Sequence, residues 1–210
     1  QILELTKNVS GSRVEGIIRG ETFNTRILLD FGSELTVLKN AITDGTIPPI
    51  GNLYPSASVF LTLRSSDATD LLQQYTLKAF PVSESWNNGQ GYAHDIPQSS
   101  IGASWYFRDS KDLATYWNSG SAHSKGNSSG VTRQLGGGAW ITGSTYESSQ
   151  SFQNQIPDIR MNVTDIVKHW VDEDIDNNGF IIKRSETDEI SGDLAGSIKF
   201  FGRESHTIFV

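Results

Sequence analysis

Hydrophobic and polar residues alternate along several short segments of this 210-residue chain. In "SASVFLTLR" the positions of Leu61 and Leu63 alternate with Thr62, and in "YTLKAFPV" the positions of Tyr75 and Leu77 share one face. A period of two, with β-branched and aromatic residues and Gly, Asn or Ser at the boundaries, is typical of β-strands. The segments "SRVEGIIRG", "NTRILLDF", "GFIIKR", "GSIKFFGR" and "HTIFV" have the same character.

These strands predict the fold class. A strand that alternates apolar and polar side chains has one buried face and one solvated face, which favours antiparallel sheets stacked on each other. We therefore expect an all-β protein, an antiparallel β-sandwich of the jelly-roll type with one or two short helices and long polar loops. The length and the lack of a linker or repeat predict a single domain over residues 1–210.

Two segments interrupt the strand pattern with helical spacing. "DFGSELTVLKNAI" predicts a short helical turn from Ser33, with Leu35 and Leu38 facing inward. "NVTDIVKHWV" predicts about two turns of helix, with Thr164 as the N-cap and Trp170 covering one end of the core.

The middle of the chain, residues 84–155, is polar, rich in glycine and studded with aromatic residues. Long loops of this kind are uncommon in compact domains unless they have a function. The tryptophans that border predicted strands or the helix are assigned to packing: Trp86, Trp105 and Trp170. The residues predicted to contact a carbohydrate or a protein partner are Trp117, Trp140, Tyr92 and Tyr146.

Charge and composition narrow the functional classes. A net charge of −7 argues against a nucleic-acid partner, because the few basic residues are scattered. The chain has no cysteine, which excludes disulfides, thiolate catalysis and cysteine-ligated metals. No stretch approaches the ~20 apolar residues of a membrane span, so no membrane insertion is expected. Because the chain opens at Gln1 within a strand-like piece, we expect it to be a segment of a longer product or a processed form.

The sequence offers little support for catalysis. Its four histidines lie in separate contexts without metal-site spacing, and no H-E-x-x-H motif occurs. A pair of carboxylates for glycoside hydrolysis is defined only in space, which leaves a hydrolase as a minor alternative. The acidic residues among the aromatic loops are Glu84, Asp95, Asp109 and Glu147.

"DIDNNGF", at residues 174–180, resembles the start of a calcium loop. Asp174, Asp176 and Asn178 occupy the first three ligand positions and Gly179 follows, but Ser185 stands where an EF-hand has its bidentate Glu. One interpretation is a helix-to-strand turn in which the Asn-Asn-Gly sequence supplies positive-φ residues. The other is a looser Ca²⁺ site, the single candidate cofactor, with extra ligands from Asp172 or Glu186.

Six motifs occur in an order that resembles a known family. They are "RILLDF", "YTLKAFPVSESWNNGQG", "GASWYFRDS", "PDIRMNVTDIVKHW", "NNGFIIKRS" and "IKFFGRESHTIF". Together they resemble the DNRLRE domain, a jelly-roll β-sandwich module also classed among carbohydrate-binding modules. "FIIKR" followed by "KFFxRExHTI" is most similar to the versions found in tailed-bacteriophage structural proteins.

The resemblance implies a non-catalytic structural or accessory component of a bacteriophage particle, at the tail, neck or capsid surface. Such a virion component would bind other virion proteins in a symmetric oligomer, with host surface polysaccharide as an additional contact. The alternative is a carbohydrate-binding module of a secreted, extracellular polysaccharide-degrading enzyme. Family members usually have a further strand at each end, so we expect either that these strands belong to a longer product or that a neighbouring subunit completes the sheet.

Overall fold

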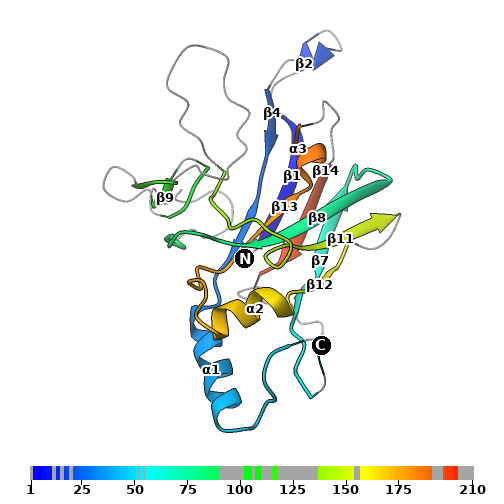
Figure 1. The fold of residues 1–210 in the computed structure, drawn as a ribbon. Helices are drawn as coiled ribbons and strands as arrows, with labels where there is room; N and C mark the ends of the chain where they lie inside the picture. The colour runs from blue at the N-terminus through cyan, green and yellow to red at the C-terminus, as the bar shows by residue number, and fades with distance from the viewer. Residues whose placement is uncertain are drawn as a thin grey trace.

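The computed structural model describes residues 2–10, 13–14, 17–18, 21–51, 53, 55–89, 102–105, 107–109, 115–117, 137–153, 157–190 and 196–202. The described part is mostly β (Figure 1). Its strands are β1 (Ile2–Ser10), β2 (Arg13–Val14), β3 (Ile17–Ile18), β4 (Glu21–Asn24), β5 (Ile27–Leu29), β6 (Phe60–Leu63), β7 (Ser65–Thr69), β8 (Gln74–Pro81), β9 (Phe107–Asp109), β10 (Thr115–Tyr116), β11 (Ser148–Gln153), β12 (Ile159–Asn162), β13 (Phe180–Arg184) and β14 (Gly196–Phe201). Its helices are α1 (Gly32–Thr43), α2 (Thr164–Val171) and α3 (Glu186–Ile190).

Two four-stranded sheets form the body of the molecule. One has the strand order β4-β1-β14-β7 and the other β11-β8-β13-β5, and the strands within both sheets pair antiparallel. The shorter pairs β12-β6, β10-β9 and β2-β3 are antiparallel as well. Figure 1 shows α1 and α2 side by side at one end of the molecule, beyond the ends of the long strands.

β8 illustrates how the predicted alternation becomes a strand. Tyr75, Leu77 and Ala79 are buried on one face, and β8 pairs with β11 on one side and β13 on the other. β11 was not predicted, because its sequence SSQSFQ is polar apart from Phe152. The buried Phe152 ring stacks on Tyr75, with a centroid separation of 4.8 Å, and this contact gives the polar strand its place in the sheet.

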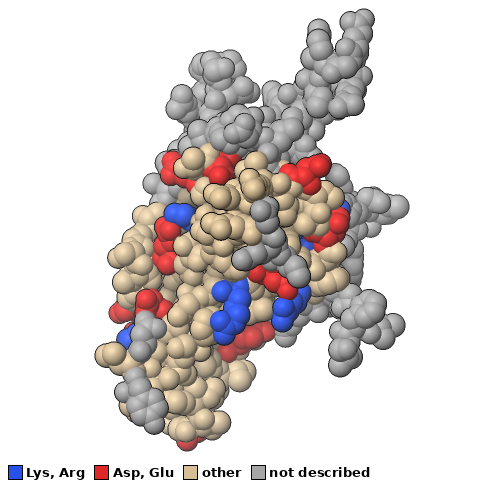
Figure 2. Space-filling model, turned by 90° about the vertical axis from the view of Figure 1, so that its right-hand side faces the viewer, with Lys and Arg blue, Asp and Glu red and all other residues tan. Residues whose placement is uncertain are grey.

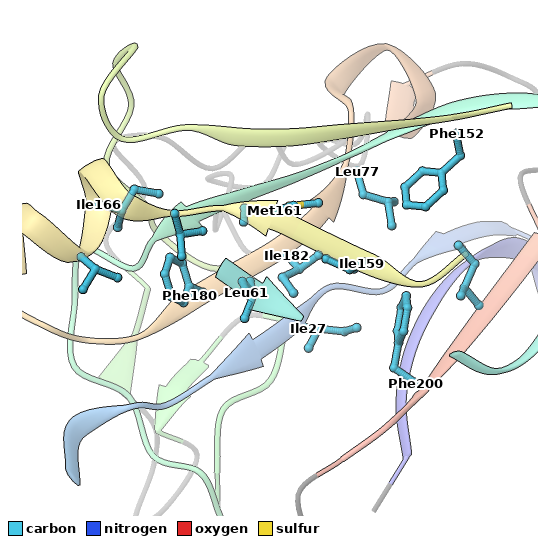
Figure 3. Close-up of a cluster of buried hydrophobic side chains, with 14 of the residues drawn as sticks. Ile27, Leu61, Leu77, Phe152, Ile159, Met161, Ile166, Phe180, Ile182 and Phe200 are labelled. Atoms are coloured by element: carbon cyan, nitrogen blue, oxygen red, sulfur yellow. The ribbon is translucent and has the colours of Figure 1, made fainter. Parts of the chain in front are cut away.

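One core cluster is shared by the two four-stranded sheets. Ile198 and Phe200 of β14 reach it from the first sheet, while β5, β8, β11 and β13 supply side chains from the second. Figure 3 shows the labelled members pointing into one common space. Arg184 adds a polar link, because its Nη2 donates to the Gly196 carbonyl at the start of β14 (3.3 Å). The buried members of this cluster are Ile27, Leu61, Tyr75, Leu77, Ala79, Phe152, Ile159, Met161, Val163, Ile166, Val167, Trp170, Phe180, Ile182, Ile198 and Phe200.

A second cluster covers the other face of β8 and β13. It contains Phe80 and Ile181 from these strands together with Val82, Trp117, Ala139 and Trp140. All five residues of β13 are therefore buried. The expectation of one solvated face does not hold for β13, because residues from the glycine-rich middle of the chain pack onto that face.

The two predicted helices are present with different details. α2 begins at Thr164, but Val163 occupies the N-cap position, and the Thr164 hydroxyl instead donates to Asn162 Oδ1 (2.6 Å). α1 has twelve residues and is longer than the predicted turn. Leu35 and Leu38 face inward as expected, yet none of the residues of α1 is buried. No helix in the described ranges is long and apolar enough to cross a membrane.

Candidate functional site

An open apolar cavity of about 330 Å³ lies between α1, α2, β6 and the first residue of β13. Ten of the twelve residues that line it are apolar, and the two polar ones are Glu34 and Thr62. The apolar residues are Phe31, Leu35, Leu38, Val59, Phe60, Leu61, Val163, Val167, Trp170 and Phe180. A concave, mostly apolar site with few polar groups is the usual form of a binding site.

Two contacts attach α1 to the body on either side of the cavity-lining residues Leu35 and Leu38. Near its start, the Phe31 ring meets Phe180 edge-on at 5.9 Å, and Phe180 in turn packs on Trp170 at 4.6 Å. Further along, Lys39 Nζ of α1 lies 2.8 Å from Glu173 Oε1, just after α2. Between these attachments the inward side chains of α1 are only partly buried, which leaves the space open.

The acidic turn that follows α2 helps to place α1. Gly179 has φ +80°, so the predicted positive-φ turn between helix and strand is confirmed at this residue, whereas Asn177 and Asn178 lack the positive φ that was also predicted for them. Asn177 Oδ1 accepts a hydrogen bond from the Gly179 N–H (3.1 Å), and Asn177 Nδ2 donates to the Phe31 carbonyl (3.2 Å). The Asn178 carbonyl accepts from Trp86 Nε1 (2.8 Å). The turn thus holds the start of α1 against the body.

The candidate calcium ligands of this turn have other surroundings. Asp174 and Asp176 are exposed, and Asp174 Oδ2 lies 2.8 Å from His169 Nδ1. Within the described part of the chain, no three His, Asp or Glu residues are grouped so that they could hold a metal ion. The Asn178 carbonyl already accepts a hydrogen bond. The contacts of the turn therefore fit a connection that positions α1.

The predicted contact aromatics are not gathered on one exposed surface. Trp117 and Trp140 have only 3% and 5% of their surface exposed, in the second core cluster. This corrects their expected exposure: both rings belong to the cluster that contains Phe80 and Ile181, and Trp117 Nε1 donates to the Ser104 carbonyl (3.0 Å). Tyr146 is half-buried, 4.7 Å from the His169 ring. Tyr92 lies outside the described residues.

Next to the second cluster lies a buried group of charges that the sequence did not predict. Arg26 binds Glu189 with two hydrogen bonds, Nε to Oε1 at 3.1 Å and Nη2 to Oε2 at 2.6 Å. Lys183 Nζ lies 3.1 Å from the same Oε2. The Arg26 guanidinium also donates to the Gly137 carbonyl (2.6 Å) and lies 5.1 Å from the centre of the Trp140 ring.

These buried charges act as a structural clamp. Burial lowers the pKa of Lys183, and this effect outweighs the attraction of Glu189, which raises it. Arg26 and Lys183 share the Glu189 carboxylate, and breaking a buried ion pair of this kind is strongly destabilising. The clamp joins β13, α3 and the segment at Gly137, and so holds that segment on the sheet.

The carboxylates considered for a hydrolase are also engaged. Glu147 Oε1 lies 2.6 Å from Lys78 Nζ, and Asp109 accepts from Asn87 Nδ2 at 3.3 Å. Glu84 Oε2 lies 3.7 Å from Arg108 Nε. Asp95 lies outside the described residues. On the face in Figure 2, basic side chains likewise occur beside acidic ones and not as a broad basic area.

An aromatic pair of one exposed and one half-buried ring lies on the β9-β10 ribbon. Tyr116 is 42% exposed, and its ring centroid lies 4.5 Å from that of Phe107. Asp109, at the end of β9, is bonded to Asn87 beside it. The sequence contained these residues within "GASWYFRDS" and "ATYW", but only the strand pairing brings the two rings together.

Comparison with protein-family models, curated proteins and solved structures finds no match to this chain.

Proposed function

We propose that this protein is a non-catalytic structural or accessory component of a bacteriophage particle that binds other virion subunits. The observation that carries the proposal is the open apolar cavity between α1 and α2, a site built for binding. Two large apolar side chains at the cavity are exposed, Val37 on α1 and Phe60 in the lining. Exposed apolar surface beside a cavity is typical of a protein-interaction site.

The proposed frame is a jelly-roll β-sandwich. Two antiparallel four-stranded sheets that contribute side chains to one core support it. The motifs of the DNRLRE resemblance also fall on structural elements: "RILLDF" runs from β5 towards α1, "FIIKR" is β13 and "IKFF" lies in β14. Such modules use a rigid frame to carry loops and helices that bind partners.

The charged residues support binding over reaction. Glu189, Glu147 and Glu84 each face a basic side chain, so they are arranged for stability. A reactive centre would instead gather titratable groups around an open position in a cleft. The open cavity is lined by one titratable residue, Glu34.

The test is to purify phage particles from cultures that carry the gene and to look for this chain by quantitative mass spectrometry. We expect it in a fixed ratio to the capsid protein, and in a symmetric oligomer when expressed with its neighbouring genes. A chain that is absent from particles and accumulates as a secreted monomer would overturn the proposal.

A second candidate function is glycan contact, which the exposed Tyr116 ring beside the half-buried Phe107 favours, because aromatic faces stack on sugar rings. This pair would serve either the virion component or a carbohydrate-binding module of a secreted enzyme. Tyr116→Ala should abolish retention on host polysaccharide, while Phe60→Ala, at another exposed aromatic residue, should not. Equal retention of both variants on the polysaccharide would refute the proposal that this pair contacts glycans.

A further inference from the structure

We infer that the cavity between α1 and α2 receives a large apolar side chain from a basic segment of a partner protein. The inference rests on the proposed function and adds the chemistry of the partner. It combines two independent features of this end of the molecule, the apolar lining of the cavity and the charge that surrounds it.

The size and lining of the cavity favour an apolar occupant. Its volume of about 330 Å³ is roughly twice that of an engineered apolar cavity of ~150 Å³ that stays dry and binds benzene. Water in it would find few hydrogen-bond partners, since ten of the twelve lining residues are apolar. One large aliphatic or aromatic side chain fits a space of this kind.

The entrance to the cavity is accessible from solvent. Phe60 lines it and is 40% exposed, and Val37 on α1 is 69% exposed. Because no residue of α1 is buried, the helix can offer both its inward positions and its flank to a partner. The cavity and these side chains together form a continuous apolar surface for one anchor residue and its neighbours.

The charge around the cavity selects a basic segment. Residues 30–59 and 163–179, which contain both helices, carry eight carboxylates and two lysines, a formal charge of −6 out of −7 for the chain. Both lysines are already paired, Lys39 with Glu173 and Lys168 with Asp172. Arg160, a further cation beside the lining, lies over the Phe60 ring at 3.9 Å.

A second copy of this chain is a poorer occupant, because it would bring the same acidic end and a net negative charge to the interface. Opposite charge, by contrast, speeds encounter and disfavours wrong partners. Glu34 lies on the wall of the cavity, and Asp30 lies just before α1. We expect the Lys or Arg side chains of the partner to lie near these two carboxylates.

The experiment uses the full chain and a short synthetic peptide of Leu and Lys arranged as an amphipathic helix. Two matched peptides replace Lys by Glu or Leu by Ser. We expect the Leu/Lys peptide to bind in calorimetry and to change the fluorescence of the tryptophans, one of which, Trp170, lines the cavity. Both matched peptides should bind about tenfold more weakly or worse. Equal binding of the Ser-containing peptide would overturn the inference, because charge alone would then account for it.

Variants of the cavity wall make the test site-specific. Leu38→Trp fills the cavity from α1 and should weaken Leu/Lys peptide binding by about tenfold or more. Asn40→Trp, at an exposed position of α1 that does not line the cavity, should bind like the wild type. Thr62→Trp fills the cavity from β6 and replaces Leu38→Trp if that variant has an altered circular dichroism spectrum. Unchanged binding by a folded cavity-filling variant would refute the assignment.

The results separate the inference from the function proposed above. If the chain is found in particles but the cavity-filling variants still bind the peptide, only the inference fails. If the cavity binds the peptide as described but particles lack the chain, the proposed virion role fails and the binding site remains.

Discussion

Gly179 and Gly45 have nearly the same backbone torsion but very different surroundings. Their φ angles are +80° and +79°. A Cβ at Gly179 would lie 1.9 Å from the Leu29 carbonyl oxygen, whereas a Cβ at Gly45 would meet nothing within 4 Å. The first glycine is required by both torsion and close packing, and the second by torsion alone.

This contrast leads to a prediction at the residue scale. Gly179→Ala should lower the free energy of unfolding by about 3 kcal/mol, because the backbone of β5 must move. Gly45→Ala should cost only about 1 kcal/mol, the cost of a left-handed alanine. Urea denaturation of both variants measures this. Equal destabilisation would contradict the role assigned to the Leu29 contact.

Among the elements, Asp158, the residue just before β12, ties this strand to the start of β7. Asp158 Oδ1 accepts from the Ser65 N–H (2.8 Å), and Oδ2 accepts from Arg64 Nη1 (2.7 Å). Burial alone would raise the pKa of Asp158, but the hydrogen bonds from Ser65 and Arg64 and the charge of Arg64 outweigh it and bring the pKa below 3.8. The ionised carboxylate therefore stabilises the folded state.

A pH dependence follows from this lowered pKa. The stabilisation is fully present above the ordinary pKa of 3.8 and is lost as the pH falls through the lower pKa of the folded state. Asp158→Asn should therefore be less stable than the wild type at neutral pH. The difference in stability should shrink as the pH falls from 3.8 through the lower pKa of Asp158 in the folded state. Thermal unfolding across pH measures it, with Asp67→Asn, an exposed carboxylate on β7, as the control. A difference that persists at low pH would show that charge is not the cause.

The elements also show where sequence patterns were sufficient. β8 and α2 were predicted because each has a regular hydrophobic period, and β13 because its short apolar run is rich in Ile and follows Gly179. β11 and β12 were missed, since SSQSFQ is mostly polar and IRMN is too short for a period to appear. The length of α1 was underestimated for a related reason: its inward stripe is only partly buried, so its apolar pattern is weak.

For the whole molecule, the shared core predicts cooperative unfolding of the two main sheets. Phe200 of β14 is fully buried among side chains of the other sheet, while the adjacent Phe201 is only half-buried. Phe200→Ala should cost about 4 kcal/mol by leaving a cavity, and Phe201→Ala clearly less.

The readout compares two signals. None of the five tryptophans lies in a strand of the β4-β1-β14-β7 sheet. Tryptophan fluorescence therefore reports on the rest of the molecule, while circular dichroism reports on both sheets. In Phe200→Ala the two transitions should shift together and remain coincident. Two separate transitions would show that the sheets unfold independently.

The candidate site was only partly predictable. Leu35, Leu38 and Trp170 were expected to face inward, and they do line the cavity. The cavity itself was not predicted, because it is the space left between α1 and α2, which lie far apart along the chain. The apolar stripe of α1 indicates a helix that faces the core. It does not show whether side chains of α2 and β6 fill the space in front of that stripe.

Features that depend on neighbouring residues could be predicted: the strand period, the amphipathic face of α2 and the glycine turn at Gly179. Features that depend on distant residues arose only with folding, as two cases show. Folding buried Trp117 and Trp140, and it brought Arg26 to Glu189, 163 positions away in the chain. Local patterns report which side of an element avoids water, whereas the partner of a buried charge and the shape of a cavity arise only when separate segments pack together.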